Sequence, residues 1–128
     1  MSAEGLKIIN QLLKSAGISY AFHEWNKAPK YPYWIGEYQE VETLTEDGYK
    51  ETTFYLDGFA RGAEAYIQLE ADKEKIYNVL GKDLGYRAIT ESGNSIAIFY
   101  AFSNGQVPTQ DAELKRMEVT LRIKEWRS

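Results

Sequence analysis

The sequence predicts an α+β domain in which two amphipathic helices cover one face of a mostly antiparallel sheet of about five or six strands. Three observations point to this class. Apolar residues recur at helical spacing in two segments, they alternate with polar residues in several others, and turn-forming residues separate the segments. The predicted order is helix, three strands, helix, three strands, and a chain of 128 residues suits a single domain over 1–128.

The N-terminal segment is predicted to be an amphipathic helix followed by a short strand. Ser2 is placed to cap the helix at its start, and Gly17 is placed to end it. From Ile18 the apolar residues alternate with smaller or polar ones, as in a half-buried strand, and the pattern breaks at 26–29. The helix residues that share the apolar side are Leu6, Ile9, Leu12, Leu13 and Ala16.

A β-hairpin is predicted around Asp47 and Gly48. The dipeptide Asp-Gly accepts the positive φ angles of a two-residue type I′ loop, and such a loop fixes the register of the flanking strands. The expected pairs are Val41 with Phe54 and Ile35 with Ala60 on the core face, and Glu40 with Tyr55 and Trp34 with Arg61 on the other face.

The segment 27–38, "KAPKYPYWIGEY", carries four aromatic residues and precedes this hairpin. Alternation sends Trp34 to the face opposite the core, and a bulge at Gly36 is expected to bring Tyr38 to the core side. The residues of this segment expected in the core are Tyr31, Tyr33 and Ile35.

The C-terminal half is predicted to be a second helix followed by three strands. Apolar residues at helical spacing cover 63–80, and alternation predicts strands at 86–90 and 95–103. The second of these strands is apolar on both sides, which is typical of a strand that is covered on both faces. The polar stretch 104–114 is expected to be a mobile or interacting loop. The last strand, 117–123, has one apolar and one charged face.

Composition and motifs argue against catalysis, a metal site and nucleic-acid recognition. The chain has no cysteine and a single histidine, His23, so neither a thiolate nucleophile nor a multi-histidine metal site is available. No serine lies in a Gly-x-Ser-x-Gly turn, and the glycines form no phosphate-binding motif. The net charge is −4, without a basic run. We therefore expect no enzyme activity, no cofactor and no sequence-specific nucleic-acid binding.

The hydropathy of the chain argues against insertion in a membrane, and its charges predict an acidic surface around the hairpin. No apolar stretch is long enough to span a bilayer and no secretory leader is visible, so we expect a soluble, unexported protein without a membrane partner. Carboxylates gather around the hairpin, where a solvated acidic edge is the simplest interpretation. Acidic surface also suits a protein that lines a channel for DNA, because it repels phosphates. The cluster comprises Glu37, Glu40, Glu42, Glu46, Asp47 and Glu51.

Several aromatic residues fall on faces that the alternation leaves outside the predicted core. Such residues are enriched where proteins contact other proteins. They could equally be covered by a helix or loop of the same chain, or line a pocket between the sheet and the helices of a small-molecule or glycan-binding module. The aromatic residues in question are Trp25, Trp34, Tyr55, Phe59 and Trp126. The candidate interface comprises Trp34, Tyr55, Phe59, Arg61 and Glu40.

Three segments resemble a known family. They are "LKIINQLLKSAG" near the N-terminus, "YPYWIGEY" after a proline, and "TTFYLDGFARG" running into a helix. Segments of this kind and in this order are similar to those of the tail terminator and tail completion proteins of long-tailed bacteriophages and prophages. The chain departs from the family pattern at Gly58, where a bulkier strand residue is common.

The resemblance implies a structural virion protein. Members of the family form a hexameric ring that caps the tail tube, stops its polymerisation and forms the joint to the head. The expected partners are further copies of the chain, the tail tube and the neck or connector proteins. The expected location is the tail or neck of the virion, after assembly in the host cytoplasm. A monomer that captures a small ligand would instead favour the binding module.

Overall fold

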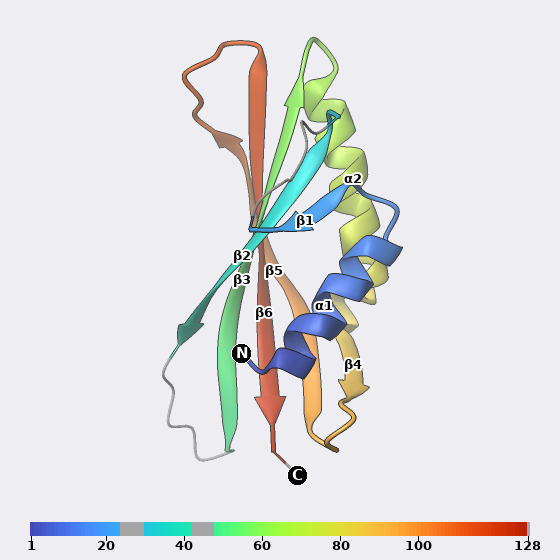
Figure 1. Ribbon diagram of the computed structural model, residues 1–128. Helices are drawn as coiled ribbons and strands as arrows, with labels where there is room; N and C mark the ends of the chain where they lie inside the picture. The colour runs from blue at the N-terminus through green and yellow to red at the C-terminus, as the bar shows by residue number, and fades with distance from the viewer. Residues whose placement is uncertain (24–29, 42–47, 128) are drawn as a thin grey trace.

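The computed structural model describes residues 1–23, 30–41 and 48–127, which form two α-helices and one mixed six-stranded sheet. Figure 1 shows a strongly twisted sheet with both helices on the same side. The α+β class and the predicted order of elements are therefore confirmed. The elements are α1 (Ala3–Ser15), β1 (Tyr20–Phe22), β2 (Tyr33–Val41), β3 (Tyr49–Arg61), α2 (Ala65–Val79), the short 3₁₀ helix η1 (Lys82–Leu84), β4 (Tyr86–Ile89), β5 (Ser95–Val107) and β6 (Leu114–Trp126).

The order of the strands in the sheet differs from their order in the chain. It runs β1-β2-β3-β6-β5-β4, so that the C-terminal strand β6 lies between β3 and β5. In this sheet β1 pairs with β2 in parallel, and every other pair is antiparallel. The central position of β6 agrees with its predicted pattern, because its apolar side chains are buried under the helices and its charged ones face the other way. The buried set is Met117, Val119, Leu121 and Ile123.

The first helix begins and ends where the sequence predicts. The side chain of Ser2 accepts a hydrogen bond of 2.9 Å from the backbone N–H of Gly5, and Gly17 has a φ of 85° after the last turn. The hydroxyl of Tyr20 donates to Asn10 Oδ1 at 2.6 Å and ties β1 to α1. Burial raises the pKa of this hydroxyl, which stays protonated at physiological pH.

The second helix packs a polar side chain against the sheet. Leu69 and Ile76, two of the apolar residues at helical spacing in 63–80, lie in the core, whereas Tyr66 of the same series is exposed. Between them Asp72 is only 6% exposed, although nothing in the helical pattern marks it as a core residue. A buried carboxylate needs a hydrogen-bond donor, and the donor comes from β2.

Trp34 of β2 supplies that donor, and this position corrects the expectation that it lies on the outer face. Its side chain is completely buried, and the indole Nε1–H donates to Asp72 Oδ2 at 2.9 Å. Gly58 lies directly opposite on β3, where an added Cβ would come within 2.6 Å of the indole ring. The glycine therefore makes room for the tryptophan, which accounts for the small residue at a position where a bulkier one is expected.

The register of β2 against β3 differs by three residues from the prediction. Val41 lies opposite Glu51 rather than Phe54. An odd shift turns one strand over relative to the other, so β2 presents to the core the face that alternation places outside. The predicted turn falls largely on 42–47, which lies outside the described residues; Gly48 has the expected positive φ of 69°.

The other expectations for this segment are also wrong. Tyr31 is exposed before the strand, and Tyr33 and Ile35 are half-buried on the side away from the helices. No bulge interrupts the pairing at Gly36. Gly36 instead allows a close approach, because a Cβ there would lie 2.6 Å from the Tyr20 hydroxyl.

Two expectations for the C-terminal half are also wrong. Strand β5 continues to Val107 and β6 begins at Leu114, so the expected loop 104–114 is shortened to 108–113 at the tip of a long hairpin. Moreover, β5 is not covered on both faces. Its register shifts between Tyr100 and Phe102, and the Phe102 side chain is 59% exposed. The apolar residues on its second side therefore lie at the protein surface and not in a second core.

The close approach at Gly58 can be tested with one methyl group. We expect Gly58→Ala to lower the free energy of unfolding by about 2 kcal/mol, because the new Cβ overlaps the Trp34 ring. Gly105→Ala is the matched control, since its Cβ would meet Met117 at an ordinary 3.7 Å. Urea denaturation of both variants measures the difference, and equal midpoints would contradict the packing described.

Truncation of Trp34 and of Tyr33 should show which face of β2 lies in the core and which lies at the surface. We expect Trp34→Ala to cost about 3 to 5 kcal/mol of stability, the usual loss for a large buried aromatic. Tyr33→Ala removes a half-buried ring on the other face and should cost about 1 kcal/mol. The comparison uses the same denaturation assay. A larger loss for Tyr33→Ala would restore the register predicted from the turn.

Candidate interaction surface

The side of the sheet away from α1 and α2, called here the helix-free face, carries aromatic and charged side chains in close contact. Along β3 these are the residues between the buried ones, and they are half-buried although no other element of the described chain lies over them. Neighbouring side chains therefore cover one another within the face. It comprises Tyr33, Ile35, Glu37, Glu51, Tyr55, Asp57, Phe59, Arg87, Phe99, Phe102, Arg116, Glu118, Arg122 and Lys124.

One end of this face, near the end of β3, is organised around Phe59. Its ring stacks on Tyr33 with centroids 5.2 Å apart, and the Arg116 guanidinium lies over it at 5.8 Å. Arg116 also donates through Nε and Nη2 to Asp57 Oδ1, at 3.1 and 2.7 Å. The arginine is thus held flat between a carboxylate and an aromatic ring, an arrangement that suits contact with a second protein surface.

The structure brings together only part of the predicted interface. Tyr55 and Phe59 both lie on the helix-free face, as expected. Trp34 is removed from it by the inverted register and cannot reach a partner while the chain is folded. Glu40 is exposed on the opposite side and pairs with the amine of Met1.

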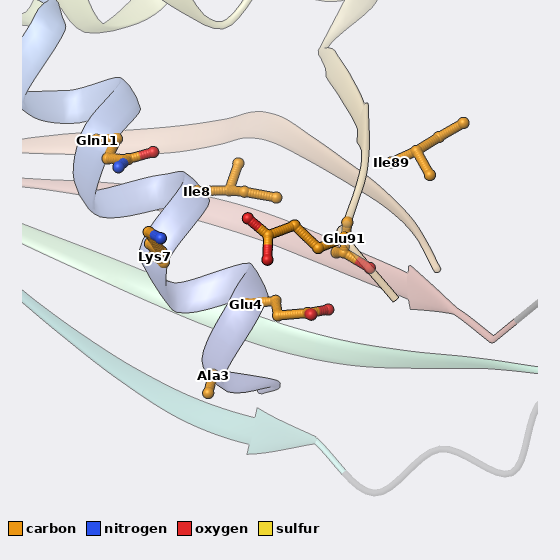
Figure 2. A pocket seen from close by; sticks show the side chains of 8 residues that line it. Ala3, Glu4, Lys7, Ile8, Gln11, Ile89 and Glu91 are labelled. Atoms are coloured by element: carbon orange, nitrogen blue, oxygen red, sulfur yellow. The ribbon is translucent and has the colours of Figure 1, made fainter. Parts of the chain in front are cut away.

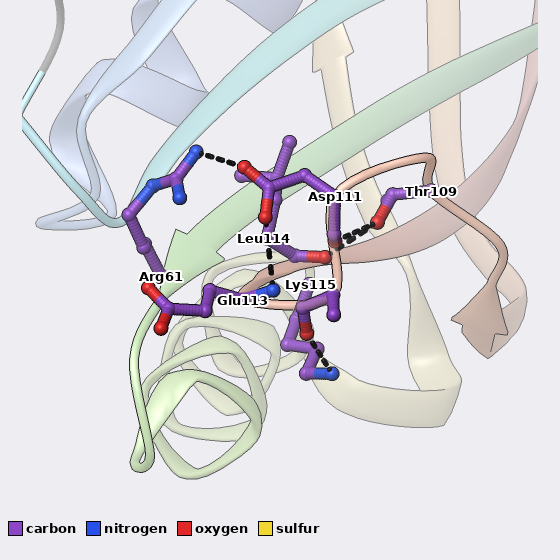
Figure 3. Close-up of polar contacts among 7 residues, drawn as sticks. Arg61, Thr109, Asp111, Glu113, Leu114 and Lys115 are labelled. Carbon is purple, nitrogen blue, oxygen red and sulfur yellow. Dashed lines mark hydrogen bonds and ion pairs between the residues drawn. The ribbon is translucent and has the colours of Figure 1, made fainter.

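Arg61, the last predicted residue, lies at the end of β3 on the same face as Phe59 and takes part in a polar clasp. Figure 3 shows the clasp between the end of β3 and the turn that joins β5 to β6. Arg61 Nη2 lies 2.7 Å from Asp111 Oδ2, and the backbone N–H of Glu113 donates to Asp111 Oδ1 at 3.0 Å. The Thr109 hydroxyl lies 2.7 Å from the carbonyl oxygens of Asp111 and Leu114. These contacts lower the pKa of the Asp111 carboxyl, through the Glu113 N–H first and the Arg61 guanidinium second.

A hollow of about 360 Å³ beside β5 was not predicted. It forms where the register shift of β5 turns Phe102 outward, and it combines aromatic rings with two cations. One of the cations, Arg122, also contacts Glu51 at 3.2 Å. The only signal in the sequence is the run of apolar residues on both sides of β5. The lining residues are Phe99, Tyr100, Ala101, Phe102, Arg122 and Lys124.

A groove of about 490 Å³ runs between α1 and the edge strand β4 (Figure 2). Ile8 lines its helix wall and Ile89 its strand wall, and the Ile89 side chain is 74% exposed. Glu4 and Glu91 lie at one end. Glu4 accepts a hydrogen bond of 2.8 Å from the Ser92 hydroxyl, which lowers the pKa of its carboxyl.

The remaining aromatic and acidic residues fall into three groups. Trp25, Glu42, Glu46 and Asp47 lie outside the described residues. Trp126 packs against Tyr49 at the end of the sheet, with ring centroids 5.5 Å apart. Glu37 and Glu40 are exposed along β2 and form an acidic edge there.

His23 is exposed, and its ring contacts Phe22 edge-on at 4.3 Å. Among the described residues, no group of three or more histidine, cysteine or acidic side chains is placed to hold a metal ion. No helix in the same part of the chain combines the length and apolar character needed to cross a membrane.

Comparison with known proteins identifies a related fold and no family. No protein-family model matches the chain, and no curated protein matches it. One solved structure aligns with a TM-score of 0.54 and 11% sequence identity, over 98% of this chain and 93% of its own. The name of that protein states no function. At this identity the likeness shows the fold alone: the arrangement of helices and sheet recurs as a whole in a second protein.

The Arg61–Asp111 clasp should respond to pH. The pKa of Asp111 is lowered in the folded state, so its stabilising contribution is complete above its ordinary value of 3.8 and is lost as the pH falls through the lower folded value. We expect Asp111→Asn to lower the melting temperature at pH 7 and to match the native chain in strong acid. Glu113→Gln is the control, since its backbone N–H is unchanged. A deficit of Asp111→Asn that persists unchanged in acid would exclude a charge-dependent clasp.

Proposed function

We propose that this chain is a structural virion protein of the phage tail-neck joint, which assembles with copies of itself into a ring, caps the tail tube and helps to join head and tail. The observation that carries the proposal is the helix-free face. Aromatic residues and arginine are enriched in the cores of protein interfaces, and here Tyr55, Phe59 and Arg116 stand together on a sheet face that no described element covers.

The arrangement of the elements supports the same proposal. The resemblance calls for a helix, a strand with a proline and aromatics, and a strand that leads directly into the main helix. The described chain has α1, then the aromatic strand β2, then β3 followed by α2. The departure at Gly58 has a local cause in the Trp34 ring and does not alter this order.

A second candidate, a small-molecule or glycan-binding module, is favoured by the hollow beside β5. Core side chains such as Trp34 and Ile76 fill the space between the sheet and the helices, so the ligand site considered from the sequence is displaced to the surface. In the hollow an exposed ring, Phe102, stands beside Arg122 and Lys124. Such a site would take a flat, negatively charged ligand.

Sedimentation velocity over a range of protein concentrations tests the proposal. We expect one assembled species of fixed mass in addition to the monomer, and rings of that mass by negative-stain electron microscopy. The double variant with Tyr55→Ala and Phe59→Ala should raise the dissociation constant of the assembly by about 30-fold. This is the equivalent of about 2 kcal/mol for truncated interface aromatics. Ile67→Ala, on the exposed side of α2, is the control.

Two outcomes would decide against the proposal. A native chain that remains a monomer at every concentration and binds a small anionic aromatic compound would favour the second candidate. An assembly unaffected by the Tyr55 and Phe59 substitutions would remove the helix-free face from the interface. A direct functional readout is the length of tubes formed by the tail-tube protein of the same genome, which the native chain should limit when it is added during polymerisation.

A further inference from the structure

Within the described residues, the sheet ends on one side at β1 and β2 and on the other side at β4. At the β2 edge, β1 pairs only as far as Phe22 with Gly36, where the His23 N–H also donates to the Gly36 carbonyl at 2.9 Å. The following residues, 37–41, are all exposed and have no strand beside them on that side within the described chain. The edge at the other side is β4.

The backbone of β4 is oriented so that part of it faces outward. The Thr90 N–H donates to the Asn94 carbonyl at 2.8 Å, and this bond closes the turn between β4 and β5. In an antiparallel ladder, hydrogen-bonded and non-hydrogen-bonded pairs alternate. Ala88 therefore bonds to β5, whereas the N–H and C=O groups of Arg87 and Ile89 point away from the sheet. This orientation lets them bond to an added strand.

The two edges are complementary in charge. Glu37 on β2 and Arg87 on β4 both lie on the helix-free face, and in the described part of the chain neither pairs with a group of opposite charge. Apolar side chains accompany them: Val41 is 40% exposed and Ile89 is 74% exposed. Neither segment contains the proline, lysine or bulge with which proteins usually block an edge.

The geometry of the sheet allows these edges to meet in successive copies. The pairing pattern makes β2 and β4 run in the same direction, so rotation about an axis along the strands sets β2 of one copy parallel to β4 of the next. With this rotation, the helices of all copies stay on the same side of the continued sheet. The groove between α1 and β4 (Figure 2) leaves room on that side for side chains of the added strand.

We propose that residues 37–41 of one copy add as a strand to β4 of the next copy, with Glu37 near Arg87, and so continue the sheet from copy to copy. The two surfaces differ, so the contact is heterologous. Such a contact closes into a ring when the rotation between neighbouring copies is a whole-number fraction of a full turn. This inference rests on the proposed function, because it adds an edge contact between ring members to the contact made by the helix-free face.

Charge exchange between the edges tests the contact. Glu37→Arg and Arg87→Glu should each raise the apparent dissociation constant of the assembly at least about tenfold, because like charges then meet in every contact. An equal mixture of the two single variants should assemble like the native chain, since every contact in an alternating ring then joins opposite charges. The double variant should also recover. Glu74→Arg, an exposed reversal on α2, is the control, and melting curves check that each variant folds.

The outcomes separate this inference from the proposed function. If the native chain assembles and both single variants assemble equally well, the contact lies elsewhere and the ring proposal stands. If both single variants are impaired and neither the mixture nor the double variant recovers, the two charges do not meet and the inference is wrong. A native chain that is monomeric throughout overturns the ring and the edge contact together.

Discussion

The hydrogen bond between the buried Trp34 indole and the Asp72 carboxylate is the constraint on which the rest of the fold depends. It joins β2 to α2, and it holds a polar pair in the core, where loss of the Asp72 carboxylate would leave the buried indole N–H unsatisfied. It also requires Gly58 on the neighbouring strand. By fixing which face of β2 is buried, this one contact decides which side chains are left on the helix-free face.

Local sequence patterns are sufficient to predict much of the fold. Ser2, Gly17 and the alternation over 117–123 give the limits of α1 and the orientation of β6, and Phe54 is correctly placed on the core side of β3. The face of β2 is inverted because both of its sides carry aromatic residues, so alternation alone cannot choose between them. The deciding partner, Asp72, lies 38 residues further along the chain and looks like an ordinary surface residue of a helix.

The candidate surface is predictable to a similar extent. Tyr55 and Phe59 follow from the alternation of β3. The pairing of Asp57 with Arg116 does not, because it spans 59 residues and exists only when β6 is inserted beside β3. The outward turn of Phe102 depends on a register shift in β5 for which the sequence offers no turn residue. Long-range pairing, rather than side-chain chemistry, is what sequence patterns fail to specify here.

The central position of β6 has a consequence for synthesis. Strands β1 to β3 and strands β4 to β5 leave the ribosome as two separate groups, and neither group is joined to the other until β6 has been made. Until then β3 and β5 each present a long unpaired edge, a surface prone to mispairing in nascent chains. The six-stranded sheet is therefore completed only after β6 has been made, and contacts of such high sequence separation are typical of slow-folding domains. In the cell, this interval is when a holding chaperone would be most useful.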